Sequence, residues 1–141
     1  MKIFVDANVL IDIITERRPF YNTAVNFISY CANQNHEIIT NSLCISNAYY
    51  ISQKVIRDVR VTKGKLASIN SNCKVLPMDQ EQLDIALISN FSDFEDALHN
   101  ACATENYCTH IITRNKNGFR NSKLRVLTPL QFLNQHDPKF Q

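Results

Sequence analysis

Short runs of strand-forming apolar residues alternate with longer segments of helical periodicity along this chain, and this alternation restricts the fold more than any other feature. The first run, "KIFV" at residues 2–5, leads directly into "ANVLIDIITE", in which Leu10, Ile13 and Ile14 recur at helical spacing. Alternating strands and helices predict an α/β fold, a three-layer α/β/α sandwich with a mainly parallel central sheet of about five strands.

The same pattern gives bounds for each element. Strands are expected at residues 2–5, 36–40, 73–77, 109–113 and 124–128. Helices are expected at residues 7–16, 21–35, 42–56, 57–72, 78–89, 92–103 and 129–135. Ser42 and Asp79 are the predicted N-caps of two helices, Gly64 is predicted to interrupt a third, and Pro129 suits a first helical position.

Length and composition indicate a single domain over residues 1–141. A chain of 141 residues with 45% hydrophobic content is long enough for one core and too short for two. Only two Gly and four Pro occur, and no linker or repeat interrupts the pattern. The net charge of +2 is too small to indicate a class of partner.

The cysteines and the N-terminus predict a cytoplasmic protein. The five cysteines are odd in number and form no C-x-x-C pair, which is typical of free thiols in a reducing compartment. Asp6 follows four strand-like residues, so no signal-peptide core fits there. Since no apolar run reaches the roughly 18 residues that a membrane span needs, no membrane partner is expected.

Polar residues follow several of the predicted strands. Asp6 ends the first strand, residues 40–42 end the second, and residues 113–115 end the strand "HIIT". Functional groups of open parallel sheets gather beyond the carboxyl ends of the strands. Asp6 is therefore a candidate site residue, although an N-cap at the start of the following helix is an equally good interpretation.

The segment "SDFEDALHNACA", residues 92–103, places three acids at the start of an apolar helix. On a helical wheel Asp93 and Asp96 lie within roughly 60° of each other, and Glu95 points elsewhere. Glu95 stands three residues after Ser92, which is the spacing of a capping box. The prediction is that Glu95 starts the helix and points away from any site.

Asp93 and Asp96 have two interpretations that the residues leave open. Both carboxylates are favourable in the first turn of a helix, where they interact with the helix dipole. They also repel each other, and a hard cation such as Mg²⁺ or Mn²⁺ would remove that repulsion. The second interpretation makes them metal ligands together with Asp6.

Four segments in this order and spacing resemble a PIN domain, the nuclease fold of many bacterial toxin-type ribonucleases. They are "FVDANVLIDII", "SNAYYI", "DFEDALHNACA" and "IITRNKNGF…VLTPLQFL", and they cover nearly the whole chain. The resemblance implies an endoribonuclease that uses Mg²⁺ or Mn²⁺ to hydrolyse phosphodiester bonds in single-stranded RNA. It also implies a toxin with an antitoxin protein as partner, and leaves a homodimer open.

The resemblance assigns roles to individual residues. Asp6 and Asp96 correspond to metal-binding catalytic acids of the family, with Asp93 beside them. Supporting or substrate-binding roles are expected at Asn47 and Asn115, where the family often has acids, and at Thr113 and Arg114, which follow the strand "HIIT". Thr113 would hydrogen-bond an acid or a phosphate, and Arg114 would hold the RNA backbone or be a solvated surface charge.

The sequence departs from the family pattern where further acids are expected. It has Asn47 in the third helix, Asn115 after "TR" and Gly118 before the Phe. An Asn offers a carbonyl oxygen without charge, so metal binding would be weaker. A degenerate PIN domain that binds RNA or a protein without cleavage is therefore the main alternative. Asp12, six residues after Asp6, is expected to be a surface or helix-packing residue.

Two other classes of function fit the sequence poorly. A zinc site from His99, Cys102, Cys108 and His110 lacks the paired ligand spacing that such sites show. A phospho-acceptor signalling domain has a similar α/β layout, but an acidic pair near the first strand and a Lys after a late strand are missing.

Overall fold

The computed structural model describes residues 1–141 and contains one five-stranded sheet of order β3-β2-β1-β4-β5. Every neighbouring pair of strands is parallel, as predicted. The strands are β1 (Lys2–Val5), β2 (Glu37–Asn41), β3 (Lys74–Leu76), β4 (His110–Ile112) and β5 (Arg125–Leu127).

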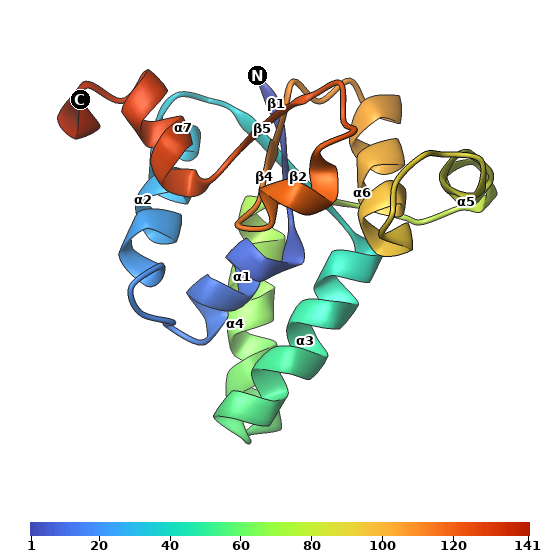
Figure 1. Cartoon of the computed structure of the whole chain (residues 1–141). Helices are drawn as coiled ribbons and strands as arrows, with labels where there is room; N and C mark the ends of the chain where they lie inside the picture. The colour runs from blue at the N-terminus through green and yellow to red at the C-terminus, as the bar shows by residue number, and fades with distance from the viewer.

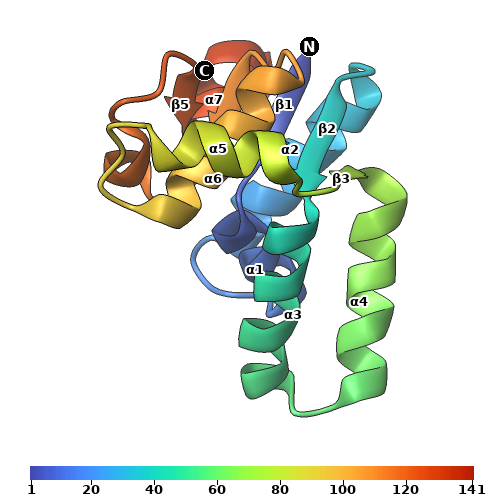
Figure 2. The ribbon, with the colours of Figure 1, turned by 90° about the vertical axis from the view of Figure 1, so that its right-hand side faces the viewer.

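Seven α-helices cover and extend this sheet. They are α1 (Ala7–Ile14), α2 (Tyr21–Asn33), α3 (Ser42–Ile56), α4 (Val59–Asn72), α5 (Gln80–Leu87), α6 (Phe94–Glu105) and α7 (Pro129–His136), with 3₁₀ helices η1 (Lys116–Phe119) and η2 (Pro138–Phe140). Figure 1 shows α2 and α7 on one side of the sheet and α5 and α6 on the other, which confirms the three-layer prediction. In Figure 2, α3 and α4 form a hairpin that projects away from the sheet. No helix combines the length and the apolar character that crossing a bilayer would require.

The central strand β1 is buried on both faces. Ile3, Phe4 and Val5 are each 0% exposed, which explains why this strand reads as a continuous apolar run rather than an alternating one. On one face, Phe27 of α2 meets Phe132 of α7 edge to face, with ring centroids 5.1 Å apart. The cysteines are all free, and four of them are buried: Cys31, Cys44, Cys102 and Cys108.

The strand order places a topological switch at β1. From β1 the chain builds outward through β2 and β3, and it later returns to the other side of β1 to add β4 and β5. In open parallel sheets the crevice at such a switch lies beyond the carboxyl ends of the strands. Asp6 directly follows β1 at this point.

Several local predictions need correction. The N-cap of α3 is Asn41 rather than Ser42, since the Asn41 side chain accepts from the Cys44 amide at 2.8 Å. Gly64 does not interrupt α4, which is continuous. The predictions for Asp79, which forms a capping box, and for Pro129, at the start of α7, are confirmed.

Candidate active site

Asp6 lies at the carboxyl end of β1 and is 6% exposed. Its Oδ1 accepts a hydrogen bond from the Ala7 amide at 2.7 Å, so the predicted N-cap role is confirmed. Its Oδ2 accepts from Thr113 Oγ1 at 2.7 Å and from Asn8 Nδ2 at 3.0 Å. The carboxylate is therefore fixed by residues that follow β1 and β4.

Thr113, directly after β4, is the centre of this network. Its hydroxyl donates to Asp6 and accepts from Asn8 Nδ2 at 3.0 Å and from the Asn115 amide at 2.9 Å. Asn8 in turn accepts from the Arg114 amide at 3.1 Å through its Oδ1. This arrangement supports the predicted hydrogen bond from Thr113 to an acid. Asn8 was not predicted, because two of its partners, Thr113 and Arg114, follow more than a hundred residues later in the chain.

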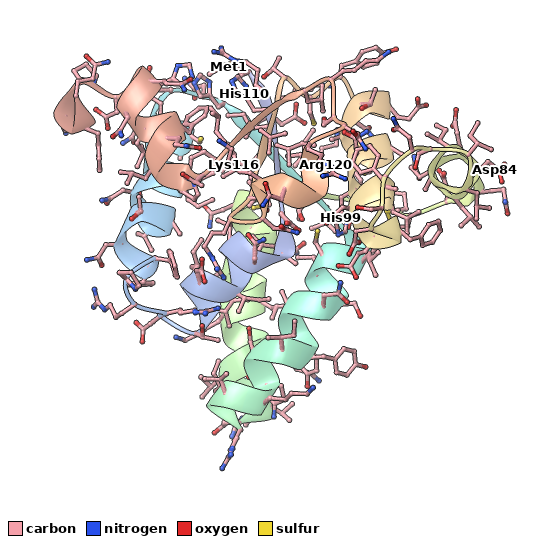
Figure 3. All side chains as sticks on the ribbon, in the orientation of Figure 1. Met1, Asp84, His99, His110, Lys116 and Arg120 are labelled. Atoms are coloured by element: carbon pink, nitrogen blue, oxygen red, sulfur yellow. The ribbon has the colours of Figure 1, made fainter.

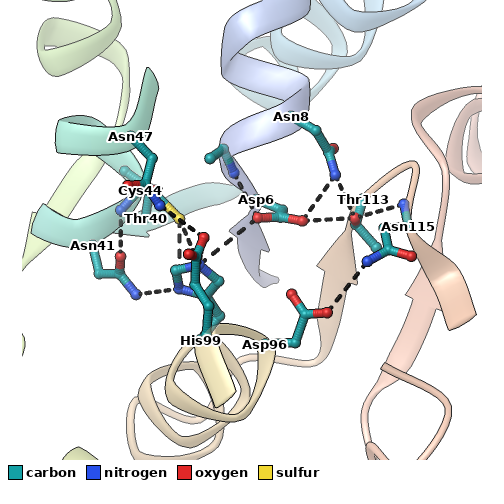
Figure 4. Close-up of polar contacts among 12 residues, drawn as sticks. Asp6, Asn8, Thr40, Asn41, Cys44, Asn47, Asp96, His99, Thr113 and Asn115 are labelled. Atoms are coloured by element: carbon teal, nitrogen blue, oxygen red, sulfur yellow. Dashed lines mark hydrogen bonds and ion pairs between the residues drawn. The ribbon is translucent and has the colours of Figure 1, made fainter. Parts of the chain in front are cut away.

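Asp96, in the first turn of α6, faces the same crevice and is 7% exposed. Its Oδ2 accepts from Asn115 Nδ2 at 3.3 Å, which links it through Thr113 to Asp6 (Figure 4). Burial raises the pKa of Asp96 to about 6, and the negative charges of Asp6 and Asp93 act in the same direction. The two buried carboxylates therefore repel each other without a full counter-charge.

This donor set fits a hard divalent cation. Asp6 and Asp96 provide carboxylate oxygens, and Asp96 Oδ1 accepts no hydrogen bond within the chain. Oxygen donors with excess negative charge are the ligands that Mg²⁺ and Mn²⁺ prefer. A cation between these acids would remove the repulsion that raises the pKa of Asp96.

The three acids of "SDFEDALHNACA" divide differently from the prediction. Asp93 is the N-cap of α6, and its Oδ1 accepts from the Asp96 amide at 3.0 Å. The predicted capping box of Ser92 and Glu95 is wrong, because the helix starts one residue later than that box requires. Asp93 is exposed, and its Oδ1 is used in capping, so we take it as a charge beside Asp96 and not as the metal ligand that the sequence predicted.

Glu95 points toward the site rather than away from it. Its Oε1 accepts from Asn47 Nδ2 at 2.7 Å and lies 3.4 Å from His99 Nε2. The hydrogen bonds from His99 and Asn47 lower the pKa of Glu95, and burial opposes them. The expectation that Glu95 only starts the helix is therefore wrong, and Asn47 reaches the site through Glu95.

His99 is a site residue that the sequence interpretation missed. It is 0% exposed and lies where α6 meets α3 (Figure 3). Its Nδ1 is 3.0 Å from Asn41 Nδ2. Because Asn41 Oδ1 is committed to the Cys44 amide, the Asn41 amide group must donate, and His99 Nδ1 must accept. The remaining hydrogen of neutral His99 is then on Nε2, which faces Glu95.

Opposing influences act on the charge of His99. Burial lowers its pKa, while the contacts with Cys44 and Glu95 and the charge of Asp6 raise it and prevail. The Asn41 donor opposes protonation, because an added hydrogen on Nδ1 would meet the Asn41 amide hydrogens. We assign His99 as the neutral Nε2–H form, since only this form satisfies every partner. A sequence signal existed: His99 follows Asp96 by three residues, on one helical face.

Asp6, Cys44 and His99 form a second group of metal-ligating types, whose ligand atoms lie within 4.8 Å of one another. A metal-binding His normally donates its other ring N–H to an acceptor. Here the group that faces Nδ1 is the donating amide of Asn41. If Nε2 bound a metal, the ring hydrogen would be on Nδ1 and would point at the Asn41 amide hydrogens. The acids therefore suit a cation better than this Cys and His pair.

Arg114 is paired with Asp12 of α1. Its Nε donates to Asp12 Oδ2 at 2.7 Å and a terminal nitrogen to Asp12 Oδ1 at 3.2 Å. Its guanidinium also lies 4.4 Å from the ring centroid of Phe20. The alternative of a solvated surface charge is wrong for Arg114, since this side chain is ion-paired and holds the loop after β4, while its contact with RNA stays a prediction. Asp12 is 1% exposed, so it is a packing residue and not a surface one.

The departures from the expected acids are visible in the geometry. Asn115 places an amide, not a carboxylate, beside Asp96. Gly118 of η1 lies against Asp96 so closely that a β-carbon there would overlap Asp96 Oδ2. Asn47 donates to Glu95 instead of offering a charge.

Comparison with known proteins places this geometry in a family. A family model described as PIN domain matches residues 2–117. "Ribonuclease VapC1" of Aquifex aeolicus (strain VF5) is 27% identical over 136 residues, covering 93% of this chain and 92% of the relative.

Solved structures share the fold at lower identity. The Rickettsia felis VapBC2 complex, bound to a DNA fragment from its promoter, matches with a TM-score of 0.69 and 16% identity over 91% of this chain and 98% of that one. A toxin-antitoxin complex from Klebsiella pneumoniae matches with a TM-score of 0.64 and 21% identity, over 89% of this chain and 96% of that one.

Proposed function

Because the chain belongs to the PIN domain family, we propose that it is a metal-dependent endoribonuclease that hydrolyses phosphodiester bonds in single-stranded RNA. The observation that supports this most strongly is the pair of buried carboxylates, Asp6 and Asp96, at the carboxyl edge of the sheet. The name of the Aquifex aeolicus relative, a ribonuclease, supports the same reaction and substrate class.

In this proposal Asp6 and Asp96 hold Mg²⁺ or Mn²⁺, and Asp93 adds negative charge beside them. When bound, such a cation neutralises charge on the phosphate and lowers the pKa of water so that hydroxide becomes available. Thr113 and Asn8 fix the Asp6 carboxylate, and Asn115 fixes that of Asp96. These contacts position both acids before substrate arrives, which is the contribution that the folded chain makes to the reaction.

The RNA backbone needs cations that are free to bind phosphate. Arg114 is paired with Asp12, but Arg120, directly after η1, is exposed and has no acidic partner within 4.0 Å. Figure 3 shows Lys116 and Arg120 on the segment that lies beside the site. We therefore assign the phosphate contact to Arg120 rather than to Arg114.

The toxin role and its partner follow from the relatives. The Klebsiella pneumoniae protein of similar fold is a toxin-antitoxin complex, and the Rickettsia felis one is VapBC2. We propose that this chain is the toxin of such a pair and binds an antitoxin protein. The five free cysteines support a cytoplasmic location, where thiols remain reduced.

A binding module without catalysis is the second candidate, and one specific observation favours it. Asn47, Asn115 and Gly118 leave the site without carboxylates at three positions where the family pattern led us to expect them. A site with fewer charges binds Mg²⁺ less tightly. Such a protein would bind RNA or a protein partner through the same surface.

The deciding experiment uses purified full-length protein with labelled single-stranded RNA, in Mn²⁺, in Mg²⁺ and in EDTA. We expect Mn²⁺-dependent cleavage by the wild type and none by Asp6→Asn or Asp96→Asn. Asp84→Asn is the matched control, since it removes one exposed acid from α5 and should leave cleavage unchanged. RNA binding without cleavage at any metal concentration would favour the binding module.

A further inference from the structure

We propose that Glu95 is a third acid of the cation site, held in place by Asn47 and His99, and that it replaces the carboxylate that position 47 does not provide. The inference rests on the proposed metal function and extends it to a residue outside the expected set. It assigns Asn47 as a positioning residue rather than a ligand.

The first support is the direction of the Glu95 side chain. Both of its contacts, with Asn47 Nδ2 at 2.7 Å and with His99 Nε2 at 3.4 Å, use the same oxygen, Oε1. Oε2 accepts no hydrogen bond within the chain. One oxygen is therefore oriented by the protein, and the other is free for a cation or its water ligands.

The second support is the position of His99 between two acids. His99 Nε2 lies 3.4 Å from Glu95 Oε1 and 4.0 Å from Asp6 Oδ1, so both carboxylates converge on one N–H. The ring itself is fixed from behind by Asn41. Glu95 is thus held on the same side of the crevice as Asp6, although its own helix is α6 (Figure 4 shows the Asp6, His99 and Asn47 side chains that define this corner).

The third support is the position of Glu95 directly before Asp96, in the first turn of α6. Glu95, whose side chain is 50% exposed, therefore lies at the rim of the crevice that holds the buried Asp6 and Asp96, with His99 between it and Asp6. A divalent cation is the partner that balances such a set.

The pairing of Asn47 with Glu95 suggests a reciprocal exchange. In the present chain an amide on α3 donates to a carboxylate on α6. The double variant Asn47→Glu/Glu95→Gln reverses this, because an amide introduced on α6 would donate to a carboxylate on α3. The double variant keeps the net charge of the chain, and its carboxylate comes from α3 instead of α6.

The test is Mn²⁺ binding by calorimetry on the purified full chain without RNA, so it does not depend on cleavage. Glu95→Gln keeps an acceptor for Asn47 and His99 but loses the charge, and it should weaken Mn²⁺ binding about tenfold. Glu105→Gln, which removes an exposed acid at the far end of α6, is the matched control and should stay within about twofold. The double variant Asn47→Glu/Glu95→Gln should recover most of the lost affinity.

Each outcome separates this inference from the proposed function. Unchanged Mn²⁺ affinity in Glu95→Gln, with loss in Asp96→Asn, overturns the role of Glu95 and leaves the nuclease proposal standing. A double variant no better than Glu95→Gln overturns the pairing with Asn47. Glu95-dependent Mn²⁺ binding by a protein that cuts no RNA supports the inference and rejects the nuclease. A wild type that binds no Mn²⁺ rejects both.

Discussion

Gly118 lies so close to Asp96 that a β-carbon at position 118 would overlap the carboxylate oxygen Oδ2 and press on the Asn115 amide. The absence of a β-carbon at position 118 therefore allows Asp96 to keep its present orientation. The atoms in the way are the ends of two short side chains, so a larger residue would turn them rather than break the backbone.

Gly118→Ala should reduce Mn²⁺ affinity by about tenfold or more, because Asp96 must rotate away from its present position. The same crowding should lower the free energy of unfolding by about 1–3 kcal/mol. Calorimetry with Mn²⁺ and urea unfolding measure the two effects. Gly64→Ala is the control: nothing lies within 4 Å of its β-carbon, and Ala in the α4 interior should stabilise by about 0.5–1 kcal/mol.

The raised pKa of Asp96 predicts a pH-dependent effect of Asp96→Asn in metal-free protein. Burial and neighbouring charges raise this pKa from 3.8 to about 6, so the folded chain binds the proton more tightly than the unfolded chain. Ionised Asp96 therefore reduces stability above the folded pKa, and the reduction disappears below the unfolded one. Asp96→Asn in EDTA should be about 1–3 kcal/mol more stable than wild type near pH 8.

Urea unfolding of both proteins as a function of pH tests this. The stability difference should shrink as pH falls through the range between the two pKa values and vanish below 3.8. If the difference in free energy of unfolding between the two proteins stays constant with pH, ionisation of Asp96 does not reduce the stability of the folded chain.

The ion pair of Asp12 and Arg114 should behave as a buried structural pair. Arg114→Met leaves Asp12, which is 1% exposed, without its counter-charge, and should lower the free energy of unfolding by about 3–5 kcal/mol. Asp12→Leu/Arg114→Met should be less destabilised than Arg114→Met alone, because no unpaired charge stays buried. Urea unfolding of the single and double variants gives the comparison; equal losses would argue against coupling between the two residues.

His99 should be a neutral imidazole with its hydrogen on Nε2 at neutral pH. Long-range ¹H–¹⁵N NMR distinguishes this form from the other tautomer and from the imidazolium. Asn41→Asp keeps an oxygen for the Cys44 amide and places a second one toward Nδ1, so it should convert His99 to the charged form. An imidazolium in the wild type would contradict the assigned donor role of Asn41.

The sheet and most of its helices could be predicted because their signals are local. Residues 2–5 are apolar throughout because β1 is buried on both faces, and the capping box at Asp79 lies within four residues of sequence. The convergence of Asp6 with the residues after β4 also followed from the parallel arrangement, since strand ends meet at one edge. These predictions needed no knowledge of side-chain partners.

The errors arose where two local signals competed or where the partner lies far away in sequence. Ser92 and Asp93 are both good N-caps, and choosing the wrong one reversed the direction assigned to Glu95. The sequence indicates a free charge at Arg114, because its partner Asp12 in α1 lies 102 positions earlier. His99 stands three residues after Asp96 on α6, but only the fold shows that Asn41 faces it.

The hydrogen bond between Thr113 and Asp6 also has a consequence for synthesis of the chain. The hydroxyl that holds the Asp6 carboxylate is added to the growing chain 107 residues after Asp6 itself. A nascent chain, or a fragment cut before β4, thus has acids but no assembled site. Any cleavage of cellular RNA would then begin only after β4 has been translated and has paired with β1.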